Sequence, residues 1–259
     1  MTATATGYAF KTERLTRSFA GFRAVNDVTV EIPLGGVRTI IGPNGAGKTT
    51  FFNLLSGLLP PSAGRIWFDG RDVTALPPYR RARLGIARSF QITNIFGRLS
   101  VRENVRLAAQ AAADGHASFL LGGKAFAGVD ERTERVLESI DLAGQADARA
   151  ENLSHGDQRR LEIGLVVARD PKVLLLDEPL AGMSPTETQA TVELITRIAR
   201  PPDGQAGRTV LLVEHDIDVV MQISTTITVF QTGAVLASGT PEEIRANESV
   251  QRAYLGELV

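Results

Sequence analysis

The stretch GPNGAGKTT, Gly42 to Thr50, follows a short β-branched segment, GVRTIIGP, and precedes an apolar segment, FFNLLSGLL. It satisfies the pattern G-x-x-x-x-G-K-[ST] between a predicted strand and a predicted helix, the context expected of a phosphate-binding P-loop. Glycines let backbone N–H groups turn toward phosphate oxygens, and the helix N-terminus adds its positive dipole end. We expect Lys48 to reach the β- and γ-phosphates of a nucleotide and the Thr49 hydroxyl to ligate Mg²⁺. The alternative, a plain glycine turn, is disfavoured because strand, glycines, Lys-Thr and helix all occur together.

A second stretch, VLLLDEP at residues 173–179, ends in two carboxylates. Its apolar run shows no alternation, which predicts a central parallel strand buried on both faces, and α/β folds place ligands at the C-terminal ends of such strands. We therefore expect Asp177 to hold the Mg²⁺ shell and Glu178 to orient and polarise an attacking water. By itself the pattern also fits a strand that ends in a solvated acidic turn. Beside a P-loop it indicates a nucleotide hydrolase.

The composition is that of a globular chain with a sizeable core. Of 259 residues, 43% are hydrophobic and 22% charged, which suits one domain or two intimate lobes. The 28 basic and 29 acidic residues leave a formal net charge of -1, so there is no global case for binding nucleic acid or an anionic membrane surface. Cysteine is absent, which excludes disulfides and thiolate metal sites and is compatible with a reducing cytosol. No apolar run approaches the length of a spanning helix, so we expect any membrane link to go through a partner protein.

The order of predicted elements is that of an α/β chain with a helical middle. Two strands are expected before residue 43, then strands in GRIWFDG, GIARSFQ, KVLLLDEP and RTVLLVEH, and a hairpin across TITVFQTGAVLASG. Helical patterns fill residues 100–168, interrupted by the Gly-rich LGGKAFAG, which we expect to be a surface loop. Four helix starts combine an N-cap residue with an acid three positions later, at Ser100, Ser154, Ser184 and Thr240.

The stretch LSHGDQRR, residues 153–160, places a serine, a histidine and an aspartate within four residues. They do not form a nucleophilic triad, because triad members must converge, whereas neighbours one and two apart on a helix do not face each other. The simplest interpretation is a helix start, with Ser154 as the N-cap. Its free N–H groups, the serine hydroxyl and the close-approach glycine Gly156 also make this start an anion site.

Six motifs occur in the order found in the ATPase subunits of ABC transporters: GPNGAGKT, RSFQ, LSHGDQ, VLLLDEP, AGMSP and LLVEH. The chain resembles that family over nearly its whole length, and the ordered set is far more specific than any single motif. Longer segments resemble the LivG-type subunits of branched-chain amino acid importers, namely AVNDVTVEI, LEIGLVVARDPKVLLLDEPLAGMSP, LLVEHDIDVVMQIS and GTPEEIRANESVQRAYLGE.

The resemblance implies an α/β fold with a P-loop NTPase core. That core would consist of a RecA-like lobe with an antiparallel β subdomain, and an α-helical subdomain would be inserted into it. Residues 7–259 would form a single ABC ATPase domain, with the core at 7–91 and 169–259 and the helical subdomain, which carries the LSHGDQ signature, at 92–168.

The resemblance also assigns site residues. The ATP-binding set would comprise Phe19, stacked on adenine, and the P-loop residues Asn44, Gly45, Ala46, Gly47, Lys48, Thr49 and Thr50.

The metal and catalytic sets share one residue. Gln91 would contact Mg²⁺ or water and relay the state of a membrane partner, and it joins Thr49 and Asp177 in the metal set. His215 would contact the γ-phosphate and forms the catalytic set with Glu178 and Gln91. Taken alone, Phe19 also fits a core phenylalanine, Gln91 would mean little, and His215 fits a structural histidine.

Partners follow from the same resemblance. Two ATPase subunits would pack head to tail, so that Ser154 and Gly156 of one cap the ATP held by Lys48 and Asp177 of the other. The pair would be two copies of this chain or one copy with a related ATPase. Transmembrane permease subunits would insert a coupling helix against the helical segment after Gln91, a periplasmic or extracellular solute-binding protein would take part indirectly, and no nucleic acid is involved. The chain would then lie at the cytoplasmic face of the inner or plasma membrane.

The implied function is ATP hydrolysis that powers uptake of branched-chain amino acids or a related small polar solute. Urea, amides and aromatic acids remain open as cargo. A non-transport ABC ATPase would usually need a long coiled-coil insertion or a second ATPase half, neither of which is present. An inactive subunit would be expected to lack Lys48, Asp177 or Glu178, and all three are retained.

Several positions depart from the family pattern. Asp157 stands where glutamine is usual, and a carboxylate near an ATP tail costs Coulomb energy, so we expect Asp157→Gln to strengthen nucleotide-dependent dimer closure. Ser184 replaces the usual Asp or Asn of the D-loop, which weakens any claim about that contact across the dimer. Thr225 and Thr226 stand where relatives often carry Asp-Arg, and the sequence offers no physical account of them.

Overall fold

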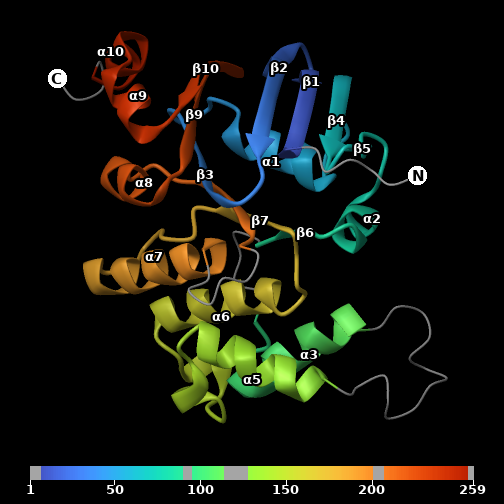
Figure 1. Ribbon diagram of the computed structural model, residues 1–259, viewed down its shortest axis with the longest axis vertical. Helices are drawn as coiled ribbons and strands as arrows, with labels where there is room; N and C mark the ends of the chain where they lie inside the picture. The colour runs from blue at the N-terminus through green and yellow to red at the C-terminus, as the bar shows by residue number, and fades with distance from the viewer. Residues whose placement is uncertain (1–6, 90–94, 114–127, 201–206, 256–259) are drawn as a thin grey trace.

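The computed structural model describes residues 7–89, 95–113, 128–200 and 207–255 (Figure 1). Gln91 lies outside these ranges, as does the Gly-rich stretch up to Ala127. None of the helices in the described part of the chain is long and apolar enough to cross a membrane.

The central layer is a six-stranded sheet, parallel except for its last strand along the chain. Both faces of the middle strands are covered, because every residue of the two runs VLLLD and TVLLV is buried. The observed runs therefore match the expectation of central parallel strands. In spatial order the strands are β10 (Ala234–Gly239), β9 (Thr226–Gln231), β3 (Gly36–Ile41), β8 (Thr209–Val213), β7 (Val173–Asp177) and β6 (Ile86–Arg88).

A second sheet is antiparallel and has the order β2 (Phe22–Pro33), β1 (Tyr8–Phe19), β4 (Ala63–Phe68) and β5 (Arg71–Asp72). The expectation of two strands before residue 43 is wrong, because β1 is a third. Its apolar alternation is broken by register shifts, with Arg14 in the left-handed region at φ 47°. Such bulges hide a strand from a test for period two.

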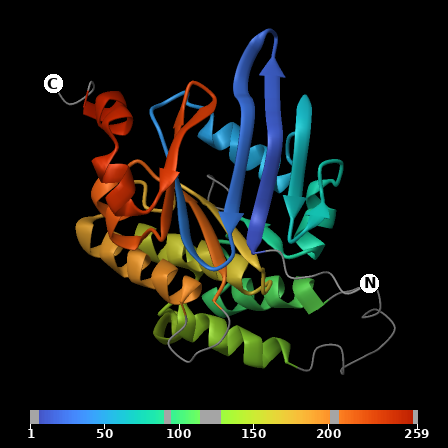
Figure 2. The same cartoon turned by 45° about the horizontal axis from the view of Figure 1, so that its top comes forward.

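One hydrophobic core lies between the two sheets, around helix α1 (Lys48–Ser56) (Figure 2). It joins Phe10 of β1 and Phe51 of α1 to alternate residues of the central strands, such as Leu175 and Leu211. The opposite faces of those strands, including Leu174 and Leu212, belong to a second core. Each central strand thus ties the two cores together.

The second core is built mainly by helices that lie at the far end of the molecule from the antiparallel sheet (Figure 1). These helices are α3 (Val101–Ala113), α5 (Val129–Ser139), α6 (His155–Val167) and α7 (Pro185–Ala199). Two short helical turns, Ala143–Gln145 and Ala150–Asn152, lie between α5 and α6 along the chain. The remaining helices among the described residues are α2 (Pro78–Arg83), beside β6, and α8 (Ile217–Ile223), α9 (Pro241–Ala246) and α10 (Glu248–Leu255), near β9 and β10.

The predicted helix starts are observed, with one difference. Reciprocal hydrogen bonds between the cap residue and the acid occur at Ser100, Ser184 and Thr240. At Ser154 only half of the pair forms: the Ser154 hydroxyl accepts from the Asp157 N–H, but the Asp157 carboxylate does not return to the cap. It binds Arg160 and Gln145 instead.

Candidate nucleotide-binding and hydrolysis site

The P-loop lies where β3 ends and α1 begins, as predicted. Gly47 adopts φ 99° immediately before the helix, and a Cβ at this position would lie 2.2 Å from the Ala24 carbonyl oxygen. Gly42 is equally confined, since its Cβ would lie 2.3 Å from the Phe230 carbonyl oxygen. Only glycine fits either position, so the backbone of the loop can wrap closely there, and the loop can turn N–H groups toward a phosphate.

Lys48 is the first residue of α1, and its ammonium is folded back over the loop. Nζ donates hydrogen bonds to the carbonyl oxygens of Gly42 at 2.6 Å and Pro43 at 3.0 Å. Burial lowers the pKa of Lys48, and the nearby carboxylates of Glu178 and Asp177 oppose that shift. Lys48 is therefore a buried cation beside two acids, held by weak neutral acceptors that a phosphate can replace.

Asp177 is the last residue of β7 and is fully buried. Its Oδ2 accepts from Arg88 Nη2 at 3.0 Å, while Oδ1 is buried and has no hydrogen-bond partner. Burial raises the pKa of Asp177, and Arg88 opposes this. A buried carboxylate oxygen without a partner suits a hard cation such as Mg²⁺, and the exposed hydroxyl-bearing Thr49 lies in the first turn of α1, which packs against β7.

Glu178 and His215 follow neighbouring strands. The Glu178 N–H donates to the Val213 carbonyl oxygen at 3.0 Å, and Glu178 has φ 49°, in the left-handed region that is uncommon for non-glycine residues. His215 follows β8, and its side chain is 67% exposed, which rules out a satisfied structural histidine. Because β3, β8 and β7 are adjacent and parallel, the P-loop, His215 and Asp177 lie at one edge of the sheet.

Glu214 was not among the site residues expected from the sequence. In the structure it is a buried acid, 1% exposed. Its carboxylate accepts from the Leu180 N–H at 3.0 Å and from the His215 N–H at 3.3 Å. Glu214 therefore ties the loop after β8 to the loop after β7. An acid just before the histidine was the only available signal, and it does not predict burial.

Phe19 ends β1 at the tip of the β1–β2 hairpin. It is 40% exposed, so the alternative of a core phenylalanine is excluded. The Arg17 guanidinium lies 4.6 Å from the ring centroid. A flat ring with this exposure can stack on a base, and Arg17 would make it a more rigid platform.

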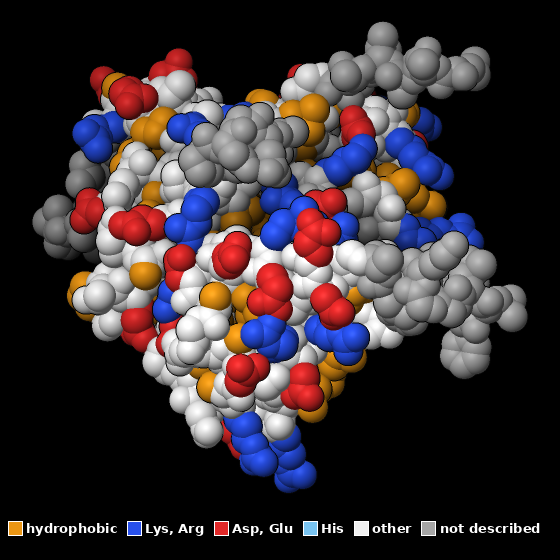
Figure 3. All heavy atoms as spheres, turned by 60° about the horizontal axis from the view of Figure 1, so that its bottom comes forward, with side chains coloured by type: hydrophobic (Ala, Val, Ile, Leu, Met, Phe, Trp, Pro, Cys, Tyr) orange, Lys and Arg blue, Asp and Glu red, His pale blue; other side chains and the backbone are white. Residues whose placement is uncertain are grey.

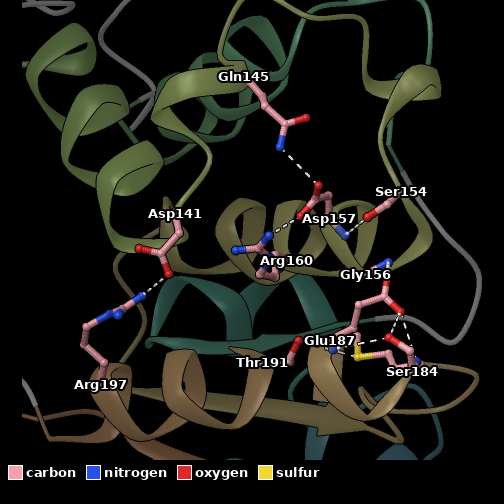
Figure 4. A network of polar contacts seen from close by, with 11 residues as sticks. Asp141, Gln145, Ser154, Gly156, Asp157, Arg160, Ser184, Glu187, Thr191 and Arg197 are labelled. Carbon is pink, nitrogen blue, oxygen red and sulfur yellow. Dashed lines mark hydrogen bonds and ion pairs between the residues drawn. The ribbon is translucent and has the colours of Figure 1, made fainter. Parts of the chain in front are cut away.

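Ser154 and Gly156 lie on a different part of the molecule, at the start of α6 (Figure 4). The Gly156 N–H donates to Glu187 Oε1 of α7 at 3.0 Å. Among the described residues, the contacts of these two positions are made with α6 and α7 and not with the P-loop. The printed hydrogen bonds of Ser154 and Gly156 therefore do not join them to the Lys48 side of this chain.

Two departures from the family pattern now have local explanations. Asp157 forms an ion pair with Arg160 and accepts from Gln145 Nε2 at 3.1 Å, so its charge is compensated within α6 (Figure 4). Thr226 accepts a hydrogen bond from Arg38, and Thr225 Oγ1 accepts from Arg200 Nη2 at 2.8 Å. The two threonines thus serve as acceptors for two arginines from neighbouring elements.

A groove of about 450 Å³ opens between α2, β6, α3 and α6. Its walls are largely apolar, and Arg88, Glu162 and Arg169 contribute its charged groups. The apolar lining includes Leu58, Tyr79, Ala108 and Leu165. Arg88 therefore takes part in both the groove and the Asp177 site.

The sequence pattern of the ABC transporter family matches residues 25–181. The chain belongs to this family. A pattern described as branched-chain amino acid ATP-binding cassette transporter matches residues 234–258. The observed α/β architecture confirms the fold predicted from the motifs, and the chain is an ABC ATPase.

Individual relatives extend over almost the whole chain. It is 43% identical to the high-affinity branched-chain amino acid transport ATP-binding protein LivG of Salmonella typhimurium, covering 92% of this chain and 94% of the relative. It is 41% identical to the corresponding BraF protein of Pseudomonas aeruginosa, covering 94% and 96%. A crystal structure of an ATP-binding cassette of an ABC transporter in its ADP conformation superposes with a TM-score of 0.80 at 26% identity, covering 97% and 100%.

Proposed function

We propose that this chain binds and hydrolyses ATP in an importer that takes up branched-chain amino acids. The observation that carries the proposal is that the ammonium of Lys48, in the P-loop, lies close enough to the carboxylates of Asp177 and Glu178 to interact with their charges. The cargo class is supported by the relatives LivG and BraF and by the match over residues 234–258.

In this proposal the P-loop amides and Lys48 hold the phosphates of ATP. Lys48 exchanges its bonds to the Gly42 and Pro43 carbonyls for phosphate oxygens, which are stronger, charged acceptors. Asp177 Oδ1 and Thr49 would hold Mg²⁺, which when bound neutralises charge on the phosphates. Phe19 supports the adenine.

Hydrolysis requires a water to attack the γ-phosphorus while the bond to the ADP oxygen breaks. Glu178 would orient that water and accept its proton, and the exposed His215 would contact the γ-phosphate. Glu214 holds the two loops that carry these residues together. Gln91 keeps its predicted role in the metal and catalytic sets, although it lies outside the described residues.

The second half of each site would come from another ATPase subunit. Ser154 and Gly156, which do not contact the P-loop of their own chain, would cap the γ-phosphate bound by that partner. The helical segment 92–168 would carry them as a unit, against the core formed by 7–91 and 169–259. Binding of ATP would close the pair, and hydrolysis would reopen it.

The permease would dock in the groove between α2, β6, α3 and α6, where an amphipathic helix can bury apolar side chains. The chain would then lie at the cytoplasmic face of the membrane, with a solute-binding protein on the other side. Acidic and basic side chains are interspersed over the outer face of the helical layer, for example in the pairs Arg106–Asp130 and Arg135–Glu131 (Figure 3). That face is unlike a nucleic-acid surface, which concentrates one sign of charge.

The direct test is Mg²⁺-dependent ATP hydrolysis by the purified chain over a range of protein concentrations, with Glu178→Gln as the control. A rate that rises faster than linearly and is lost in the variant is expected if two copies complete each other's sites. ATP binding without hydrolysis at every concentration would assign the second half-site to a related ATPase or require the permease. Failure to bind ATP would overturn the proposal.

The cargo is tested by co-expressing the chain with its permease and binding protein and measuring uptake. Leucine uptake that depends on Glu178 is expected. Uptake of urea or an amide in place of leucine would reassign the substrate class.

A further inference from the structure

Glu187, in the first turn of α7, makes two kinds of contact with its two carboxylate oxygens (Figure 4). Oε2 accepts from the Ser184 N–H at 3.0 Å and from the Ser184 hydroxyl at 2.7 Å, which caps α7. Oε1 points to the other helix and accepts from the Gly156 N–H at 3.0 Å. One side chain therefore bridges the start of α7 and the start of α6.

The contact with Gly156 is close. A Cβ at position 156 would lie 2.6 Å from Oε1 and 2.7 Å from Cγ of Glu187, so the approach depends on glycine. The hydrogen bonds from the Ser184 backbone and side chain, and then from Gly156, lower the pKa of Glu187. The side chain is therefore an anion at neutral pH, and it lies where a helix N-terminus favours one.

This bridge is not a general property of helix caps in this chain. Thr240 and Glu243 form the same reciprocal cap at α9, also with proline at the first helical position. Within the described part of the chain, the hydrogen bonds of Glu243 stay inside that cap. The same holds for Glu103 at α3. Capping alone thus does not require the second oxygen to reach another helix.

We propose that Glu187 is an internal anion that occupies the Gly156 amide and competes there with phosphate. The inference rests on the proposed function in one respect, namely that Gly156 faces the γ-phosphate of the partner's ATP. A phosphate that takes the Gly156 N–H must displace Oε1, and two like charges at one donor repel each other. The charge of Glu187 therefore lowers the affinity of this half-site for phosphate. In a subunit pair without ATP, it also opposes occupation of the half-site by anions that bind more weakly than ATP.

The competition can be measured on a single amide. His155–Gly156 is the only His-Gly dipeptide in the sequence. Labelling the full chain with carbonyl-¹³C histidine and ¹⁵N glycine therefore gives one doubly labelled peptide bond, whose NMR signal reports on the Gly156 N–H. Inorganic phosphate is titrated against the parent and against Glu187→Gln, which keeps the size and an acceptor oxygen but removes the charge.

Two variants serve as controls. Glu243→Gln makes the same change in the matched cap of α9, and Glu193→Gln removes a charge from an exposed position further along α7. We expect Glu187→Gln to shift the Gly156 signal before phosphate is added. We also expect it to lower the phosphate concentration at half-shift at least threefold, with neither control doing so.

The inference would be overturned by an unmoved Gly156 signal in Glu187→Gln, by an unchanged or higher half-shift concentration, or by no response to phosphate in either protein. A lower half-shift concentration in Glu193→Gln as well would assign the effect to general charge and overturn it too. The titration needs neither ATP nor a second subunit. Failure of ATP hydrolysis would therefore count against the proposed function alone. An unmoved Gly156 signal or an unchanged half-shift concentration would count against Glu187 alone, and no response to phosphate in either protein would count against Gly156 as a phosphate-binding position as well.

Discussion

Arg88 Nη2 lies 3.0 Å from Oδ2 of Asp177, at a strand end where the other carboxylate oxygen is buried without a partner. Arg88 is itself fixed, because Nη1 donates to Asn53 Oδ1 at 2.5 Å and to Ser56 Oγ at 3.2 Å. Its side chain is only 10% exposed, yet it forms part of the groove beside α3 and α6. One guanidinium thus joins the floor of the groove to the acid expected to hold the metal.

Replacing Arg88 with methionine should destabilise the chain. The change leaves Asp177 buried without its counter-charge, which typically costs about 3 kcal/mol when the carboxylate is ionised. The cost should shrink in acid, since burial raises the pKa of Asp177 and a protonated carboxyl needs no cation. Urea unfolding at about pH 8 and pH 5, without nucleotide, measures both values. An equal cost at the two pH values would show that Arg88 acts through packing instead.

Two P-loop glycines should respond differently to alanine. Gly45 has φ 79° but open space around its Cβ position, so Gly45→Ala should cost only about 1 kcal/mol of backbone strain. Gly47→Ala adds a contact of 2.2 Å with the Ala24 carbonyl oxygen and should cost at least about 3 kcal/mol. Unfolding free energies of the two variants provide the comparison, and similar costs would contradict the described loop geometry.

Glu214 should make stability fall as the pH rises. Burial raises its pKa above the ordinary value of 4.5, and the backbone N–H groups of Leu180 and His215 only partly oppose this. The folded state therefore binds the proton more tightly than the unfolded state. This contribution is fully present below about pH 4.5 and is lost as the pH rises through the higher folded pKa.

The test compares the parent with Glu214→Gln, which cannot titrate, by urea unfolding between about pH 4.5 and pH 8. The parent should lose stability relative to the variant as the pH rises. Glu193→Gln, at an exposed position, should run parallel to the parent. A constant difference between the parent and Glu214→Gln would refute the assignment.

The Asp157–Arg160 pair refines the expectation for the signature. Asp157→Gln leaves Arg160 without its ion-pair partner, which adds net positive charge near the phosphate expected there. ATP-dependent association, measured by sedimentation in a Glu178→Gln background, should therefore strengthen, and Asp157→Gln combined with Arg160→Gln should return it toward the parent. Association that is equally strong in the double variant would mean that the carboxylate itself, not the balance of the pair, opposes closure.

The elements that can be predicted from the sequence are those whose local residue pattern matches the burial of that segment in the folded protein. The runs around Leu174 and Leu211 are apolar throughout because both faces are buried, and the P-loop is recognisable because its glycines obey local backbone constraints. β1 escaped detection because its bulges break the alternation that a strand on one core normally shows. Ser154 was predicted correctly as a cap, but the partner of Asp157 was not.

The supporting residues could not be predicted, because their partners lie far away along the chain. Arg81 looks like one of several basic residues on α2, yet it is 1% exposed and donates to the Leu54 and Leu55 carbonyls at the end of α1. Burial lowers its pKa to about 10. Arg88 and Glu187 are similar cases, with partners 89 and 31 residues away. No local period encodes such pairs.

The strand order of the parallel sheet also bears on biosynthesis. β3 is made early, but both of its neighbours, β8 and β9, begin only at residues 209 and 226. A nascent chain thus emerges from the ribosome with its P-loop attached to an apolar strand that has nothing to pair with on either side. Chains that terminate early should aggregate through that open strand instead of yielding a partly active product. The sheet that supports the P-loop is therefore completed only after residue 226 has been synthesised.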